Sequence, residues 1–223
     1  MGIGEKIVWA ALLPLCLAVH GEAETRVFVT VDDYAGITPG ALGRAESVAA
    51  RILHRAGIEM VWQNRSRSEA GHEAPKGEPK HFESSDITLR ILSRQMALRL
   101  GPDGHGVNSS LGMALPGGAQ GLGSLAYIYF HRIRKLARLV ERHTRTEEVI
   151  LGHAVAHEIG HLLLNTPMQS AAGIMHVPWE GTDLARALEG GLVFTPAEAE
   201  RMQANLRALA RPASTSALLE KAH

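Results

Sequence analysis

The clearest chemical pattern in the sequence is the run His157-Glu158-Ile159-Gly160-His161. On a helix, His157 and His161 lie one turn apart on the same face, so both imidazoles can bind one metal ion from the same side. Glu158 then lies beside the metal, where its carboxylate can hold and deprotonate a water molecule. This H-E-x-x-H pattern is typical of zinc hydrolases. It predicts His157 and His161 as metal ligands and Glu158 as the general base.

The motif lies in a segment that is predicted to be a helix over about residues 144–164. Thr144 and Glu147 have the spacing of an N-terminal capping box, and an apolar run follows them. Asn165 can adopt the left-handed conformation that ends a helix, and Pro167 prevents continuation. The alternative to a metal site is a buried helix whose histidines are only hydrogen-bonded.

A third metal ligand has to come from outside the motif, because catalytic zinc usually has three protein ligands. Cys16 is the only cysteine and lies in the predicted export signal, so the donors must be nitrogen or oxygen. Three downstream residues are candidates: Gln169 through its carbonyl oxygen, His176 through its imidazole and Glu180 through its carboxylate. The sequence leaves them open, together with water or no stable site.

Two further residues near the motif are predicted not to bind the metal. His153 cannot share an ion with both His157 and His161, because two turns of helix span about 12 Å. It is interpreted as a packed histidine. Met175 is expected to form an apolar floor, since thioethers suit softer metals than zinc.

The elements that must position these residues are predicted from their apolar periodicity. Strands are predicted over 26–31, 58–63, 86–92 and 124–130. Helices are predicted over 40–56, 131–143 and 183–188. A last helix is predicted to begin at Pro196, with Thr195 and Glu198 forming its capping box. The opening strand, helix and strand indicate a crossover unit, and hence a mixed sheet with helices against it. The fold class is therefore predicted to be α/β (α+β). The last strand is either a sheet edge that pairs with an extended peptide or an interior strand.

Several segments give weaker signals. Residues 64–81 are predicted to be a polar surface loop, and residues 93–100 either continue a strand or turn. The glycine-rich stretch 101–123 is either a cleft wall or an irregular connection. His72 and His81 are expected to be solvated, and His105 is a weak ligand candidate.

The first 23 residues are predicted to be a signal peptide. Lys6 precedes an apolar run over 7–19 that is too short to span a bilayer comfortably, and cleavage is expected after Ala23. The alternative is an uncleaved interfacial anchor. The predicted domain organisation is a signal at 1–23, one domain that carries the H-E-x-x-H motif at 24–212 and a flexible tail at 213–223. We expect a secreted or periplasmic protein with no stable membrane insertion after cleavage.

Composition limits the class of protein further. The chain has 223 residues, of which 45% are hydrophobic, which suits one globular domain. Its 23 basic and 23 acidic residues balance, so nothing favours a nucleic-acid partner. The basic helix over 131–143 fits either an anionic surface or, preferably, an ordinary solvated face.

The run AHEIGHLLL over residues 156–164, followed by Gly173-Ile174-Met175, resembles the zincin metallopeptidases. The resemblance is greater to the metzincins, in which a methionine-bearing turn lies beneath the metal. In detail it is similar to uncharacterised exported bacterial zinc-dependent proteases with HEIGHLLL and GIM motifs. The resemblance implies a zincin-like mixed sheet with an active-site helix and a Met-turn, bound Zn2+, and a peptide or protein substrate.

The chain departs from these patterns at the third ligand. Metzincins have a glycine and a histidine where this chain has Leu164 and Pro167, and the exported group has them where this chain has Asn165 and Gln169. The predicted function is an exported zinc metallopeptidase that hydrolyses peptide bonds with a Glu general base and a zinc-bound water. The alternatives are a catalytically weakened, zincin-like binding protein and a structural metal site with no open position.

Overall fold

The structure is a computed structural model that describes residues 25–65, 86–100, 110–118, 121–140 and 145–210. Several expectations lie outside these residues: the signal at 1–23, the tail at 213–223, most of the loop at 64–81, and the histidines His72, His81 and His105.

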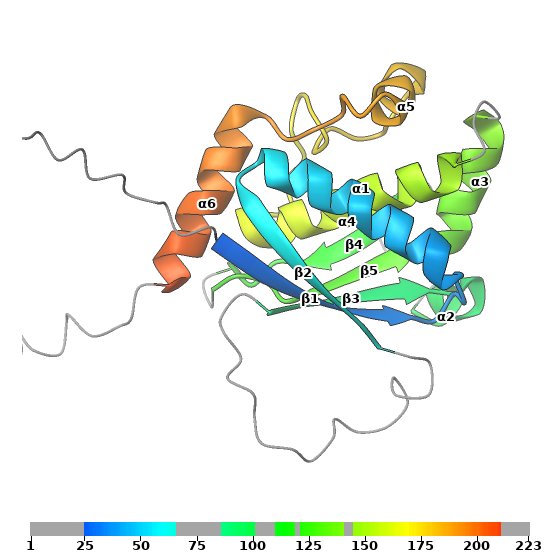
Figure 1. Ribbon diagram of the computed structural model, residues 1–223, viewed down its shortest axis with the longest axis horizontal. Coiled ribbons are helices and arrows are strands. Elements are labelled where there is room, and N and C mark those ends of the chain that lie inside the picture. The colour runs from blue at the N-terminus through cyan, green and yellow to red at the C-terminus, as the bar shows by residue number, and fades with distance from the viewer. Residues whose placement is uncertain (1–24, 66–85, 101–109, 119–120, 141–144, 211–223) are drawn as a thin grey trace, which may run out of the picture.

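The centre of the fold is a five-stranded mixed sheet with the strand order β2-β1-β3-β5-β4 (Figure 1). Its strands are β1 (Thr25–Asp33), β2 (Ile58–Arg65), β3 (Asp86–Leu92), β4 (Gly112–Leu115) and β5 (Leu125–Tyr129). Strand β1 pairs in parallel with β2 and β3, and β3 pairs in parallel with β5. Strand β4 runs antiparallel to β5 and forms one edge. The predicted α/β class with a mixed sheet is therefore confirmed.

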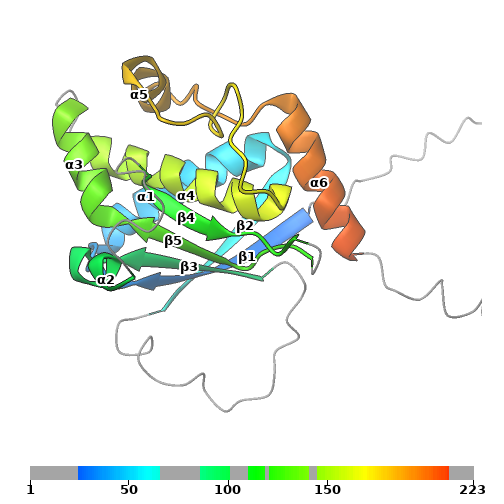
Figure 2. The ribbon, with the colours of Figure 1, turned by 180° about the vertical axis from the view of Figure 1, so that it is seen from behind.

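The strand-helix-strand unit predicted at the start is present as β1, α1 (Pro39–Arg55) and β2. Helix α1 begins at Pro39, one residue before the predicted start, because Thr38 caps it, accepting a hydrogen bond from the Ala41 N–H, and Pro39 occupies the first turn. Its apolar face is buried against the sheet and α4 (Thr146–Leu164). Helices α1 and α4 lie side by side on one face of the sheet (Figures 1 and 2).

The remaining helices are short or peripheral. They are α2 (Arg94–Arg99), α3 (Phe130–Val140), α5 (Gly181–Leu188) and α6 (Pro196–Ala210). The capping box predicted for the last of them is present, since the Thr195 N–H donates to Glu198 and the Glu198 N–H donates to Thr195 Oγ1. In the described part of the chain, no helix is both long and apolar enough to cross a bilayer.

Three expectations need correction. Residues 93–100 contain helix α2 rather than a strand or a turn, because Ser93 caps it by accepting from Met96 N–H. The glycine-rich stretch contains strand β4, whose four residues are too few to show alternation and are ordered by pairing with β5. Helix α4 begins at Thr146 after Arg145, which makes no side-chain cap hydrogen bond. Thr144 of the predicted capping box lies outside the described residues.

Candidate metal centre

Helix α4 carries the motif through the interior of the molecule. Every residue from Ile150 to Leu164 is buried, because the helix packs against α1, α6 and strand β4. It ends at Asn165, as predicted, in a left-handed conformation (φ 53°, ψ 42°). The Asn165 side chain also exchanges two hydrogen bonds with the Gly118 backbone, which holds the β4–β5 connection against the helix end. The motif histidines therefore project from a fixed element.

The imidazoles of His157 and His161 face each other on this helix. Their Nε2 atoms are 3.1 Å apart, and their ring planes meet at 84°. On the opposite side of each ring, Nδ1 lies 2.8 Å from a backbone carbonyl, that of Ile174 for His157 and that of Thr166 for His161. A carbonyl only accepts, so each Nδ1 carries a proton and donates it. In the neutral rings, each Nε2 then presents a lone pair.

Both rings are neutral at pH 7. Burial, with a smaller contribution from the neighbouring His161, lowers the pKa of His157 to about 4, against the opposing effect of the Ile174 carbonyl. Burial also lowers the pKa of His161, against the Thr166 carbonyl. Two lone pairs thus face each other with no proton between them.

This donor arrangement fits a divalent metal ion such as zinc. Facing lone pairs repel each other unless a cation or a hydrogen-bond donor lies close to both. Neutral imidazole is a preferred zinc ligand. A carbonyl that accepts from the second nitrogen fixes the tautomer and ring orientation of a metal-binding histidine. The residues present therefore fit the metal that the motif predicts.

The structure brings one of the three candidate third donors to this pair. The side-chain amide nitrogen of Gln169 lies 3.1 Å from His161 Nε2. Rotating the side-chain amide by half a turn exchanges its nitrogen and oxygen. The oxygen then faces His161 Nε2, so Gln169 can provide a neutral oxygen donor. His176 faces Asp183 at 3.8 Å, and Glu180 is an exposed residue at the N-cap of α5. Across the described ranges, no group of three His, Cys, Asp or Glu side chains can hold a metal.

The side chain of Glu158 extends from α4 towards the edge strand β4. Its carboxylate is buried and accepts a hydrogen bond from the Ala114 backbone. Burial raises the pKa of Glu158 to about 8, and the Ala114 hydrogen bond opposes this shift. A carboxyl group with a pKa near neutrality can both take up and release a proton at physiological pH.

Gly112 makes room for this carboxyl group and was not predicted to matter. A Cβ at position 112 would lie 2.6 Å from Glu158 Oε1 and 2.7 Å from the Tyr127 carbonyl oxygen. Only glycine therefore lets β4 approach both α4 and β5. Glycine is frequent in this stretch, so nothing in the sequence distinguishes Gly112 from its neighbours.

The Gly173-Ile174-Met175 turn packs against the motif, with Met175 fully buried as apolar floor. The Ile174 carbonyl accepts from both His157 Nδ1 and the Trp179 indole N–H. At Gly160 an added Cβ would lie 2.8 Å from the Met175 sulfur, so this glycine of the motif allows the turn to approach the helix. The role of the Ile174 carbonyl could not be predicted, because every residue type has a backbone oxygen.

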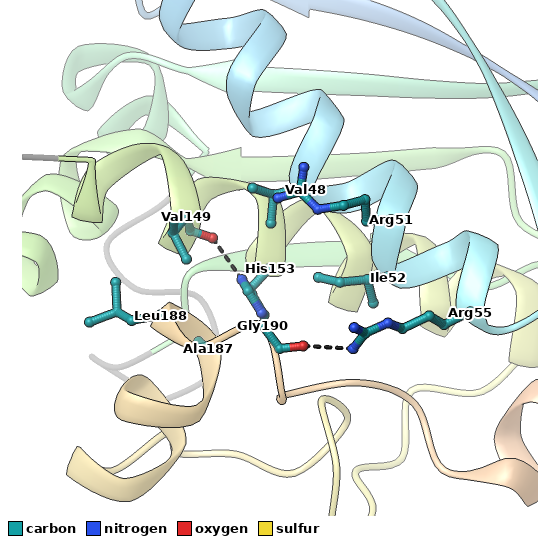
Figure 3. Close-up of a pocket in the computed structure, with 9 residues that line it drawn as sticks. All are labelled: Val48, Arg51, Ile52, Arg55, Val149, His153, Ala187, Leu188 and Gly190. Atoms are coloured by element: carbon teal, nitrogen blue, oxygen red, sulfur yellow. Dashed lines mark hydrogen bonds between the residues drawn. The ribbon is translucent and has the colours of Figure 1, made fainter. Parts of the chain in front are cut away.

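His153 is buried away from the facing imidazoles, as helix geometry predicts. Its Nδ1 lies 2.8 Å from the Val149 carbonyl oxygen, and burial is the main cause that lowers its pKa. Figure 3 shows it in a pocket between α1, α4 and the end of α5. Arg55 spans this pocket by donating to the Gly190 carbonyl at 2.7 Å. His153 thus belongs to the packing of α1 on α4.

No protein-family model and no curated protein matches the sequence. Among solved structures, archaemetzincin from Methanopyrus kandleri is 12% identical, with a TM-score of 0.48 over 85% of this chain and 99% of that chain. A zinc-dependent peptidase from Methanocorpusculum labreanum is 10% identical, with a TM-score of 0.48 over 79% of this chain and 99% of that chain.

Proposed function

We propose that this chain is a zinc-dependent metallopeptidase that hydrolyses peptide bonds. The observation that carries the proposal is the pair of neutral imidazoles, His157 and His161, whose Nε2 lone pairs face each other at 3.1 Å. The residue between them in the motif, Glu158, is a buried carboxyl group with a pKa near neutrality. When bound, zinc supplies a Lewis acid that polarises a carbonyl group and activates water.

Three side chains would hold the metal. His157 and His161 provide nitrogen donors whose orientation is fixed by the Ile174 and Thr166 carbonyls. Gln169 provides an oxygen donor from the loop after α4. An amide oxygen is neutral, so this set keeps the full positive charge of the ion but binds it more weakly than three imidazoles would.

Glu158 moves the protons. In its ionised form it accepts a proton from the attacking water, and it then delivers that proton to the amine that leaves. Its burial between α4 and β4 keeps bulk water away from the carboxyl group, and the Ala114 N–H fixes its position.

The peptide substrate would pair with strand β4. The sequence left open whether the strand predicted over 124–130 is a sheet edge that pairs with a peptide. That strand is β5, and it lies inside the sheet between β3 and β4. Strand β4 is instead one of the two terminal strands of the described sheet, and it packs closely on Glu158: a Cβ at Gly112 would meet this side chain, and the Ala114 backbone is hydrogen-bonded to it. An extended peptide added to this edge by backbone hydrogen bonds would place its peptide bonds beside the general base.

We further propose that the protein is exported by the signal at 1–23 and acts as a secreted or periplasmic enzyme on peptides or proteins. N-terminal sequencing of the protein recovered from its host tests this proposal. A mature N-terminus at Glu24 is expected, and an intact Met1 would contradict cleavage.

The test of the enzymatic proposal compares zinc content and peptidase activity in the wild type, Glu158→Gln and His157→Ala. Glu158→Gln should keep its zinc and lose activity by at least about 100-fold, in the range that general acid–base groups contribute. His157→Ala should lose both. Ser47→Ala, at an exposed position on α1, is the control and should lose neither. A wild type that binds no zinc would overturn the proposal.

The neutral third donor favours one alternative, a weakened zincin-like protein that binds peptides without cleaving them efficiently. Gln169 stands where a stronger anionic or imidazole ligand is usual. This alternative predicts bound zinc in the wild type but no hydrolysis that depends on Glu158. The same zinc and activity measurements therefore separate the two functions.

A further inference from the structure

The third donor is not held in place by its own packing. Gln169 lies in the connection between α4 and the Gly173-Ile174-Met175 turn, and it is exposed. The preceding residue, Met168, is also exposed, with 73% of its surface accessible. Burial therefore does not fix the Gln169 side chain, and its position depends on how the backbone on either side is held.

The residue that follows Gln169 is held strongly. The Ser170 N–H donates to the Met175 carbonyl at 3.0 Å, which closes the loop onto the turn. The Ser170 hydroxyl donates to Glu198 Oε1 on helix α6. Ser170 is thus tied at once to the turn beside His157 and to the N-terminus of α6.

Glu198 does more than cap its helix. Its Oε2 accepts from the Thr195 N–H at 2.8 Å, which is the ordinary capping-box contact. Its Oε1 is then free to accept from Ser170, and the side chain is buried. A capping carboxylate on a surface helix would leave that second oxygen to water. Here the carboxylate joins α6 to the loop that carries the third donor.

We propose that Glu198, acting through Ser170, is a positioning residue that sets Gln169 against the His157–His161 pair. This inference rests on the proposed function, because it assumes that these three side chains bind zinc. A neutral amide donor gains little from charge, so its contribution depends on being held in place before the metal arrives. The tether from α6 provides this preorganisation.

The test is a double-mutant cycle on zinc affinity in the purified full chain, with a chromogenic chelator as competitor. Ser170→Ala removes the tether but leaves Glu198 bound to Thr195. We expect it to weaken zinc binding by about 10-fold to 100-fold, as for other partners that orient a ligand. Ser47→Ala is the matched control, because it also removes one serine hydroxyl hydrogen bond, to the Gly43 carbonyl, and should not change zinc affinity.

The decisive comparison uses Gln169→Ala. If Ser170 acts through Gln169, then adding Ser170→Ala to Gln169→Ala should weaken zinc binding no further. Two effects that multiply, or an unchanged affinity in Ser170→Ala, would overturn the positioning role while leaving the proposed function intact. A wild type that binds no zinc would overturn the proposed function and the positioning role together.

Discussion

Replacing Glu158 with glutamine should stabilise the metal-free protein at alkaline pH. The wild-type carboxyl group has a pKa of about 8 in the folded state and about 4.5 when unfolded. Between these values the folded protein holds a proton that the unfolded chain releases. The stability that this proton provides is fully present below pH 4.5 and is lost as the pH rises through 8.

The size of this effect follows from the two pKa values. Each pH unit in this window removes about 1.4 kcal/mol of the free energy of unfolding, so the whole interval corresponds to about 5 kcal/mol as an upper limit. Glutamine has the same shape, carries no proton that titrates here, and keeps an oxygen to accept from the Ala114 N–H. Glu158→Gln should therefore gain stability over the wild type as the pH rises, by several kcal/mol at pH 8.

The assay is urea denaturation of both proteins, with chelator present, from pH 4.5 to pH 8.5. The buried histidines also change the stability with pH. Because the pKa of His157 is lowered to about 4, its contribution is lost as the pH falls from 6.5 towards 4. That loss is common to both proteins and cancels in their difference. Parallel pH profiles for the two proteins would refute the inference that burial raises the pKa of Glu158.

Three other substitutions test the site and its packing. Gln169→His should raise the zinc affinity by about tenfold or more, because imidazole is a stronger donor than an amide oxygen. Competition with a chelator measures this affinity, and an unchanged value would exclude residue 169 as a metal ligand. Gly112→Ala should reduce kcat while zinc content stays near one ion per chain, because the new Cβ would meet Glu158 Oε1 at 2.6 Å; full activity would contradict the contact. Gly160→Ala should lower the free energy of unfolding by about 1–3 kcal/mol, because its Cβ would lie 2.6 Å from the Phe194 ring. Its control, Gly43→Ala, meets no atom within 4 Å and should stabilise α1 by about 0.5–1 kcal/mol; equal effects in thermal unfolding would count against the packing at Gly160.

The features that the sequence predicted well are those encoded by neighbouring residues. The β1–α1–β2 unit follows from local apolar periodicity, and Asn165, Thr195 and Glu198 mark helix ends through contacts with residues a few positions away. The convergence of His157 and His161 follows from the pitch of one helix. Each of these is fixed within a single turn or a single element, so the residue types and their spacing are sufficient.

Tertiary structure decided everything that joins distant segments. Three downstream donors had suitable chemistry, and only the path of the chain after α4 brought Gln169 to the imidazoles. The four residues of β4 form a strand because β5 lies beside them, and Gly112 matters only because that pairing presses β4 against Glu158. The Ile174 and Thr166 carbonyls fix the histidine tautomers, although any residue there has the same oxygen. Sequence by itself thus determined that His157 and His161 face each other with Glu158 beside them, whereas packing between elements determined the approach of Gln169, the edge position of β4 and the raised pKa of Glu158, because burial and approach are properties of the assembled fold.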